Sequence, residues 1–125
     1  MGLFDSFLHN ETPKWPGFSL ESMAQLEELI ESSFSIPQLV FKHSTRCSIS
    51  RYVLIDFISG YSFSAQDFGA WYLDLLNFRS ISNAVADRLE VTHQSPQLLV
   101  IKNGKVVAHS SHEQINSLVL SGFLN

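Results

Sequence analysis

Apolar residues recur along the chain at spacings that predict an alternation of helices and strands. Residues 19–34 carry them at helical spacing, and Ser22 with Gln25 can form a capping box at the start, so this segment predicts a helix. Pro37 then ends helical structure, and residues 38–42 form a short apolar run typical of a buried central strand. The apolar positions of the helix are Met23, Leu26, Leu29, Ile30 and Phe34.

The middle of the chain allows more than one interpretation. Residues 51–58 are rich in β-branched and aromatic side chains, so propensity alone predicts a strand, although the same positions could line a buried helix. Residues 64–67 predict a short helical turn, and residues 70–76 predict a strand. Residues 80–90 have the apolar spacing of an amphipathic helix.

The last third of the chain predicts a hairpin followed by a helix. Residues 98–102 and 106–109 are short apolar strands joined through Asn103-Gly104, a dipeptide that favours a tight hairpin turn. Residues 113–120 predict a final helix that buries its apolar positions and ends before Gly122.

The length of 125 residues predicts a single domain, residues 1–125, in which residues 1–18 form an irregular arm with Trp15 packed on the body. A net charge of −4 without a cluster of Lys or Arg argues against nucleic-acid binding. The apolar runs are far shorter than a membrane span, and the first residues do not resemble a secretion signal. With its single cysteine, the chain is expected in a reducing cytoplasm, as a monomer or weak dimer.

Cys47, the only cysteine, directly follows the first predicted buried strand, so neither an internal disulfide nor a Cys-x-x-Cys pair can form. At the first turn of a helix, a thiol meets unpaired backbone N–H groups and the positive end of the helix dipole, which favour the thiolate. Arg46 adds a fixed positive charge. A lone cysteine is more often a small buried hydrophobe, but these polar neighbours indicate a reactive thiol. Hydroxyls that could hydrogen-bond the sulfur belong to Ser44, Thr45, Ser48 and Ser50, the last standing where a dithiol enzyme keeps its second cysteine.

A later segment, His93-Gln94-Ser95-Pro96-Gln97, opens an apolar strand. A thiol after one strand and a proline before another are typical of a thioredoxin-like α/β fold, with a central mixed sheet of about four to five strands flanked by helices. An ordinary loop proline is trans, but this fold favours a cis Pro96. The backbone of Ser95 could then pair with an extended substrate.

Other polar residues have simpler interpretations. Histidines near strand ends are usually hydrogen-bonded surface residues, and His109-x-x-His112 lacks further ligands, so no metal site is expected. Lys42 is most simply a solvated charge. His43 and His93 could tune the site without being needed for it.

Five segments together resemble the monothiol bacilliredoxins of the bacillithiol system, and the resemblance covers most of residues 34–120. These segments are His43-Ser44-Thr45-Arg46-Cys47-Ser48-Ile49-Ser50, Ser80-Ile81-Ser82-Asn83, His93-Gln94-Ser95-Pro96-Gln97, Lys102-Asn103-Gly104 and His109-Ser110-Ser111-His112.

The resemblance implies a bacterial thiol-disulfide oxidoreductase that removes bacillithiol from mixed disulfides on client proteins, with Cys47 as the nucleophile. It implies no bound cofactor, with bacillithiol as the thiol co-substrate. Its partners would be bacillithiol and bacillithiolated proteins. Arg46 could pair with the malate carboxylates of bacillithiol, as bidentate geometry allows.

One departure from the family pattern leaves two alternatives open. The family usually has proline after the nucleophile where this chain has Ser48, which leaves the start of the helix less preorganised. The Cys-x-x-Ser spacing also resembles monothiol glutaredoxins that hold an iron–sulfur cluster between two chains. A non-redox thioredoxin-like interaction module with an inert Cys47 is the third interpretation.

Overall fold

Five strands form one mixed sheet in the order β1-β3-β2-β4-β5. The computed structural model describes residues 14–125. Strands β1, β3 and β2 run parallel to one another, and β4 pairs antiparallel with both β2 and β5. The strands are β1 (Phe18–Ser19), β2 (Gln38–His43), β3 (Gly69–Asp74), β4 (Gln97–Lys102) and β5 (Lys105–Ser111).

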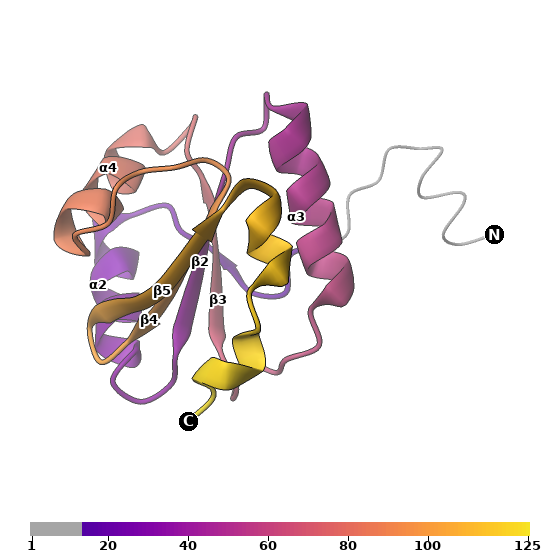
Figure 1. Cartoon of the computed structure of the whole chain (residues 1–125). Coiled ribbons are helices and arrows are strands. Elements are labelled where there is room, and N and C mark those ends of the chain that lie inside the picture. The colour runs from indigo at the N-terminus through magenta and orange to yellow at the C-terminus, as the bar shows by residue number, and fades with distance from the viewer. Residues whose placement is uncertain (1–13) are drawn as a thin grey trace.

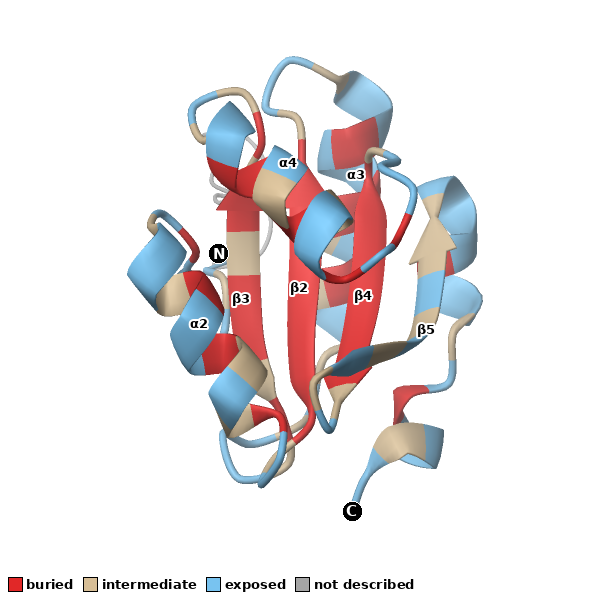
Figure 2. Ribbon diagram, turned by 90° about the vertical axis from the view of Figure 1, so that its left-hand side faces the viewer, coloured by how far each residue is buried: buried red, intermediate tan, exposed pale blue. Residues whose placement is uncertain are grey.

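Helices cover both faces of the sheet. Helices α2 and α4 lie on one face and α3 lies on the other, where the C-terminal 3-10 segments η1 and η2 pack beside it (Figure 1). Strand β2 is buried at all six positions between these layers (Figure 2). The helices are α2 (Met23–Ser32), α3 (Ser48–Gly60), α4 (Arg79–Arg88), η1 (His112–Ser117) and η2 (Leu120–Phe123).

Alternate residues of the buried strands supply two apolar cores. Val40 joins the core under α2 and α4, whereas Leu39 and Phe41 join the core under α3. This follows from strand geometry, in which successive side chains point to opposite faces. The mixed five-stranded α/β architecture expected from the sequence is confirmed.

Residues 51–58 lie within α3, so the strand that propensity predicted there is wrong. Val53, Leu54 and Phe57 are buried against the core, while Tyr52 is exposed. This spacing is that of one helix face, and packing of that face outweighs the weak β propensity of its residues. The open choice between strand and buried helix is therefore decided by burial.

The helix expected over residues 113–120 is also wrong, because two 3-10 segments replace it. Ile115 and Leu120 are buried, while Val119 is exposed. A segment of eight residues gains little from helix propensity alone, so the tertiary contacts of its few apolar residues decide its conformation.

The other helices and strands match their predictions to within a few residues, except that Phe18 and Ser19 form β1, where the end of the arm and the start of the helix were predicted. Ser22 caps α2, and its hydroxyl accepts a hydrogen bond from the Gln25 N–H at 3.2 Å, as the capping-box pattern indicates. Met23 and Phe34, predicted on the buried face, are exposed. The part of the predicted arm up to residue 13 lies outside the described residues. The indole N–H of Trp15 donates to the Ala70 carbonyl at 3.2 Å, so Trp15 does pack on the body.

Candidate functional site

Cys47 is the N-cap residue of α3 and is half-buried. Its N–H donates to the Ser44 carbonyl at 3.1 Å, and its carbonyl accepts from the Arg51 N–H at 3.0 Å. The thiol therefore stands at the N-terminal end of a 13-residue helix, where backbone N–H groups lack partners within the helix.

Three of the predicted site residues surround Cys47 on the surface. Thr45, Arg46 and Ser48 are exposed. Their side chains are thus accessible to a molecule that approaches the thiol. Their roles as thiolate-stabilising or substrate-binding residues stay predictions.

Ser50, in contrast, points into the protein and is fully buried. Its hydroxyl accepts a hydrogen bond from the Ser44 N–H at 3.2 Å and is hydrogen-bonded to Nδ1 of His43 at 2.8 Å. These contacts fasten the turn that carries Cys47 to the end of β2. Burial lowers the pKa of the His43 imidazole, while Asp74 and Ser50 act in the opposite direction.

The segment that contains Ser95 and Pro96 lies at the same edge of the sheet as the thiol turn. Lys42 pairs with Gln97 in antiparallel register, so β2 ends where β4 begins. The Ser95–Pro96 peptide bond is cis, as the fold argument predicted. The Pro96 carbonyl accepts from the His112 N–H at 3.0 Å, which joins this segment to η1.

Two residues interpreted from the sequence as surface groups are buried. Lys42 has an exposed fraction of 0 % and His43 of 4 %, so the solvated-charge interpretation of Lys42 is wrong. His93 is exposed, but its Nδ1 lies 3.2 Å from Lys42 Nζ and is the acceptor there, because an ammonium group can only donate. The burial of Lys42 and His43 could have been predicted from their position on a central strand, because every residue of a strand covered on both faces is enclosed.

Exposed apolar side chains next to the thiol were also missed. Ile49 and Tyr52 on α3 have exposed fractions of 59 % and 74 %. They lie three residues apart, the spacing of neighbours on one helix face. Both side chains are therefore accessible to a molecule that approaches the start of α3.

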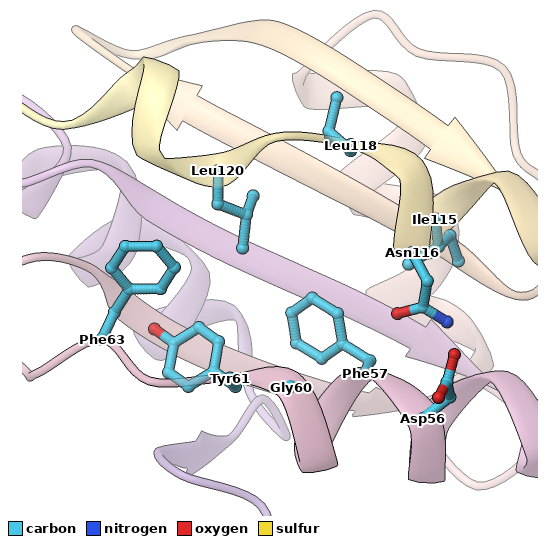
Figure 3. A pocket seen from close by; sticks show the side chains of 9 residues that line it. All are labelled: Asp56, Phe57, Gly60, Tyr61, Phe63, Ile115, Asn116, Leu118 and Leu120. Atoms are coloured by element: carbon cyan, nitrogen blue, oxygen red, sulfur yellow. The ribbon is translucent and has the colours of Figure 1, made fainter.

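In the part of the chain that the structure describes, one hollow beside α3 includes a residue of the thiol turn, and another lies farther along the helix. A cavity of about 320 Å³ is lined by seven residues of the thiol turn, α3, β3 and the N-terminal segment, namely Trp15, His43, Thr45, Arg51, Leu54, Ile58 and Tyr72. The other cavity, of about 290 Å³, lies between α3 and the C-terminal segments (Figure 3). It includes Gly60, twelve residues beyond the start of α3 at Ser48 and thus roughly 18 Å along the helix, so it is not part of the thiol site.

Comparison with known families decides the class of this thiol protein. A model of the monothiol bacilliredoxin family BrxC matches residues 18–120, which include Cys47 and the Ser95–Pro96 segment. The chain belongs to the monothiol bacilliredoxin family. Membership of this family supports a thiol redox function for the chain.

Solved structures similar to this bacilliredoxin confirm the thioredoxin fold. One protein with a thioredoxin fold is 28 % identical, with a TM-score of 0.63, and the match covers 80 % of this chain and 86 % of that one. Thioredoxin of Fasciola hepatica matches at 20 % identity and a TM-score of 0.64, over 83 % and 96 % of the two chains. Thioredoxin of Malassezia sympodialis matches at 13 % identity and a TM-score of 0.66, over 85 % and 87 %.

Two further findings concern the described part of this bacilliredoxin. Within residues 14–125, no three His, Cys, Asp or Glu side chains gather in a group that could hold a metal ion. Among the helices of the same residues, none is long and apolar enough to cross a bilayer.

Proposed function

We propose that this protein removes bacillithiol from mixed disulfides on client proteins, with the Cys47 thiolate as the nucleophile. The observation that carries the proposal is the placement of the only cysteine. Cys47 caps a 13-residue helix beside accessible polar side chains, in a chain of the monothiol bacilliredoxin family. A thiol at a helix start is suited to thiol–disulfide exchange.

The proposed cycle consists of two exchanges. The Cys47 thiolate attacks the bacillithiol sulfur of the client mixed disulfide, and the client leaves as a thiolate while a Cys47–bacillithiol disulfide forms. The thiolate of a second bacillithiol then attacks the bacillithiol sulfur of that disulfide. Cys47 leaves as a thiolate and bacillithiol disulfide is released. In sum, one free bacillithiol is consumed, the client thiol is regenerated, and the client mixed disulfide is exchanged for one bacillithiol disulfide, so atoms and electrons balance.

The second step needs an external thiol because the chain offers no resolving cysteine. Ser50 holds that position, and its hydroxyl is engaged with His43 and Ser44. A hydroxyl cannot form a disulfide. Bacillithiol therefore serves as the co-substrate, and one chain is sufficient for the cycle, consistent with a monomer or weak dimer.

The surface around the thiol provides for both substrates. Exposed Arg46 is suited to the carboxylates of bacillithiol, and Thr45 and Ser48 offer hydroxyls beside the sulfur. The apolar Ile49 is available to the client protein. An extended client segment would pair with the backbone of Ser95. This chemistry requires a compartment that keeps thiols reduced, such as the bacterial cytoplasm.

The proposal is tested by the intact mass of the reduced protein after brief exposure to bacillithiol disulfide. We expect a single bacillithiol adduct on the wild-type chain, released by free bacillithiol, and no adduct on Cys47→Ser. Circular dichroism of Cys47→Ser should match the wild type, because Cys47 makes no side-chain capping bond. Oxidised glutathione, in parallel, measures selectivity.

Two results would contradict the proposal. An adduct on Cys47→Ser would place the chemistry at another group, and the absence of an adduct on the wild type would favour an inert interaction module. If the wild type reacts equally with both disulfides, the thiol exchange stands but bacillithiol selectivity fails.

A further inference from the structure

A buried ammonium group lies beneath the thiol-bearing edge of the sheet. The side chain of Lys42 is fully buried on the α2/α4 face, the face to which Val40 also points. Its Nζ donates to the Ser82 carbonyl in α4 at 3.4 Å and to Nδ1 of His93 at 3.2 Å. The ion pair found within residues 14–125 joins Arg88 and Glu27, so no carboxylate neutralises Lys42.

His93 belongs to the segment that leads into Ser95 and Pro96. This segment is tied down from the same side by Gln97, the cross-strand partner of Lys42. The Gln97 side chain donates to the Thr92 carbonyl at 3.0 Å and accepts from the Gln94 N–H at 3.3 Å. Neighbouring residues of β2 and β4 thus hold three consecutive residues of one loop, with Lys42 holding the middle one.

Burial of the charged Lys42 side chain works against the stability of the fold. Burial lowers the pKa of the Lys42 amine to about 8, which means that the fold pays to keep this group charged at neutral pH. An unbranched apolar side chain of similar length could fill the same space without that cost. What distinguishes the lysine from such an apolar side chain is its pair of hydrogen bonds, to the Ser82 carbonyl and to His93.

We propose that Lys42 is a positioning residue of the thiol-exchange site, which holds His93 and thereby fixes the Ser95–Pro96 segment at the edge that carries Cys47. This inference rests on the proposed function, because the segment matters for exchange only if a substrate binds there. Lys42 itself touches no substrate. It acts through His93, two residues before Ser95.

The hydrogen bond between Lys42 and His93, called the tie below, requires an unprotonated Nδ1 on His93 and is therefore sensitive to acid. Two cationic groups face the imidazole, Lys42 on β2 and Arg79 at the start of α4, and with burial they lower the pKa of His93. When pH falls through that pKa, imidazolium and ammonium face each other and the hydrogen bond is lost. Deprotonation of Lys42 at alkaline pH leaves N–H donors in place, so the tie persists there. The segment should loosen only on the acid side.

The experiment compares the full-length wild type with Lys42→Met and with Lys105→Met, a control in which an exposed lysine is replaced. Backbone amide hydrogen exchange of residues 92–95 is measured by NMR, together with the rate of Cys47 adduct formation. In Lys42→Met we expect amide protection to fall by about tenfold and the adduct rate by several-fold, as expected for loss of one charged hydrogen bond. The stability of this variant at neutral pH should equal or exceed that of the wild type. Lys105→Met should match the wild type in protection and rate.

A second variant separates positioning from a simple packing role. The Gln side chain of His93→Gln can still accept from Lys42 but does not titrate. It should keep the protected segment at neutral pH and lose the acid-induced loosening seen in the wild type. The ¹⁵N chemical shift of wild-type His93 reports directly whether Nδ1 is an acceptor, even if a variant does not fold.

The proposal is overturned by unchanged amide protection in folded Lys42→Met, by acid loosening that persists in His93→Gln, or by a protonated Nδ1 at neutral pH. Failure of the proposed function gives a different pattern. In that case the wild type forms no bacillithiol adduct, while the amide and ¹⁵N measurements still show the tie.

Discussion

At the scale of single residues, the Ser50 hydroxyl links the end of β2 to the first turns of α3. It is hydrogen-bonded to both His43 and Ser44, and it is completely buried. A thiol at this position would form weaker hydrogen bonds to the same groups. The serine that stands in place of a second cysteine therefore also holds the turn that presents Cys47.

Replacement of Ser50 by alanine should lower the free energy of unfolding by about 1–3 kcal/mol, because the Ser44 N–H and the buried His43 ring lose their partner. Urea denaturation measures the change. Ser48→Ala, at an exposed position of the same turn, is the control and should change stability by less than about 0.5 kcal/mol. Equal effects in the two variants would show that the Ser50 contacts contribute nothing.

Arg46→Gln should slow adduct formation between Cys47 and bacillithiol disulfide by up to about tenfold, since a charged pair with a carboxylate is lost. The wild-type rate should also fall with added salt more steeply than that of the variant. Arg46→Lys keeps the charge without the planar fork and is expected to lie between them. Rates that are the same in all three proteins would exclude Arg46 from substrate binding.

At the scale of elements, α3 begins without a side-chain cap. Cys47 is its N-cap and forms no side-chain capping bond, and Ser48 is its first residue. The family proline at this position would match the fixed φ of a first helical residue. Serine keeps a backbone N–H at this place, one of the donors at a helix start that have no partner within the helix.

Ser48→Pro should raise the free energy of unfolding by about 0.4–1 kcal/mol, because proline restricts the unfolded chain and fits the first turn. Thermal and urea denaturation measure it. Ser59→Pro, near the other end of α3, is the contrasting variant and should cost about 3 kcal/mol through loss of a helical hydrogen bond. A destabilised Ser48→Pro would mean that the start of α3 does not have ordinary first-turn geometry.

At the scale of the whole molecule, the layers of the fold meet at β2. Two successive residues of β2 point to opposite faces of the sheet, His43 toward α3 and Lys42 toward α2 and α4. One strand therefore supports the thiol turn from one face and the Ser95 segment from the other. The buried charge of Lys42 is a cost borne by the whole fold.

This cost predicts how stability depends on pH. The folded-state pKa of Lys42 is about 8, below the ordinary value of 10.5, so between these values the unfolded chain binds more protons than the folded chain. Stability of the wild type relative to Lys42→Met should therefore rise with pH across this window, by roughly 2 kcal/mol after allowance for solvent screening. Urea denaturation of both proteins at pH about 8 and 10 tests the sign. A difference that is constant with pH would show that Lys42 titrates normally.

Regular elements with long apolar periods were predictable. The 3.6-residue period of α2 and α4 and the Asn103-Gly104 hairpin are local signals, since they depend on residues close in sequence. The conformations of α3, η1 and η2 were not predictable in this way, because their apolar residues fit several conformations. Contacts with distant residues chose among these.

The sequence by itself determined the alternation of elements, the single thiol and its position after a buried strand. It also contained the short motifs of the bacilliredoxin family. Only the tertiary structure decided that Ser50 faces inward and that Lys42 is enclosed beside His93. Lys42 and His93 are far apart in the chain, and no local period reports which side chains two crossing segments bring together. Burial and hydrogen bonding are properties of that assembly, so they appear only once the sheet has formed.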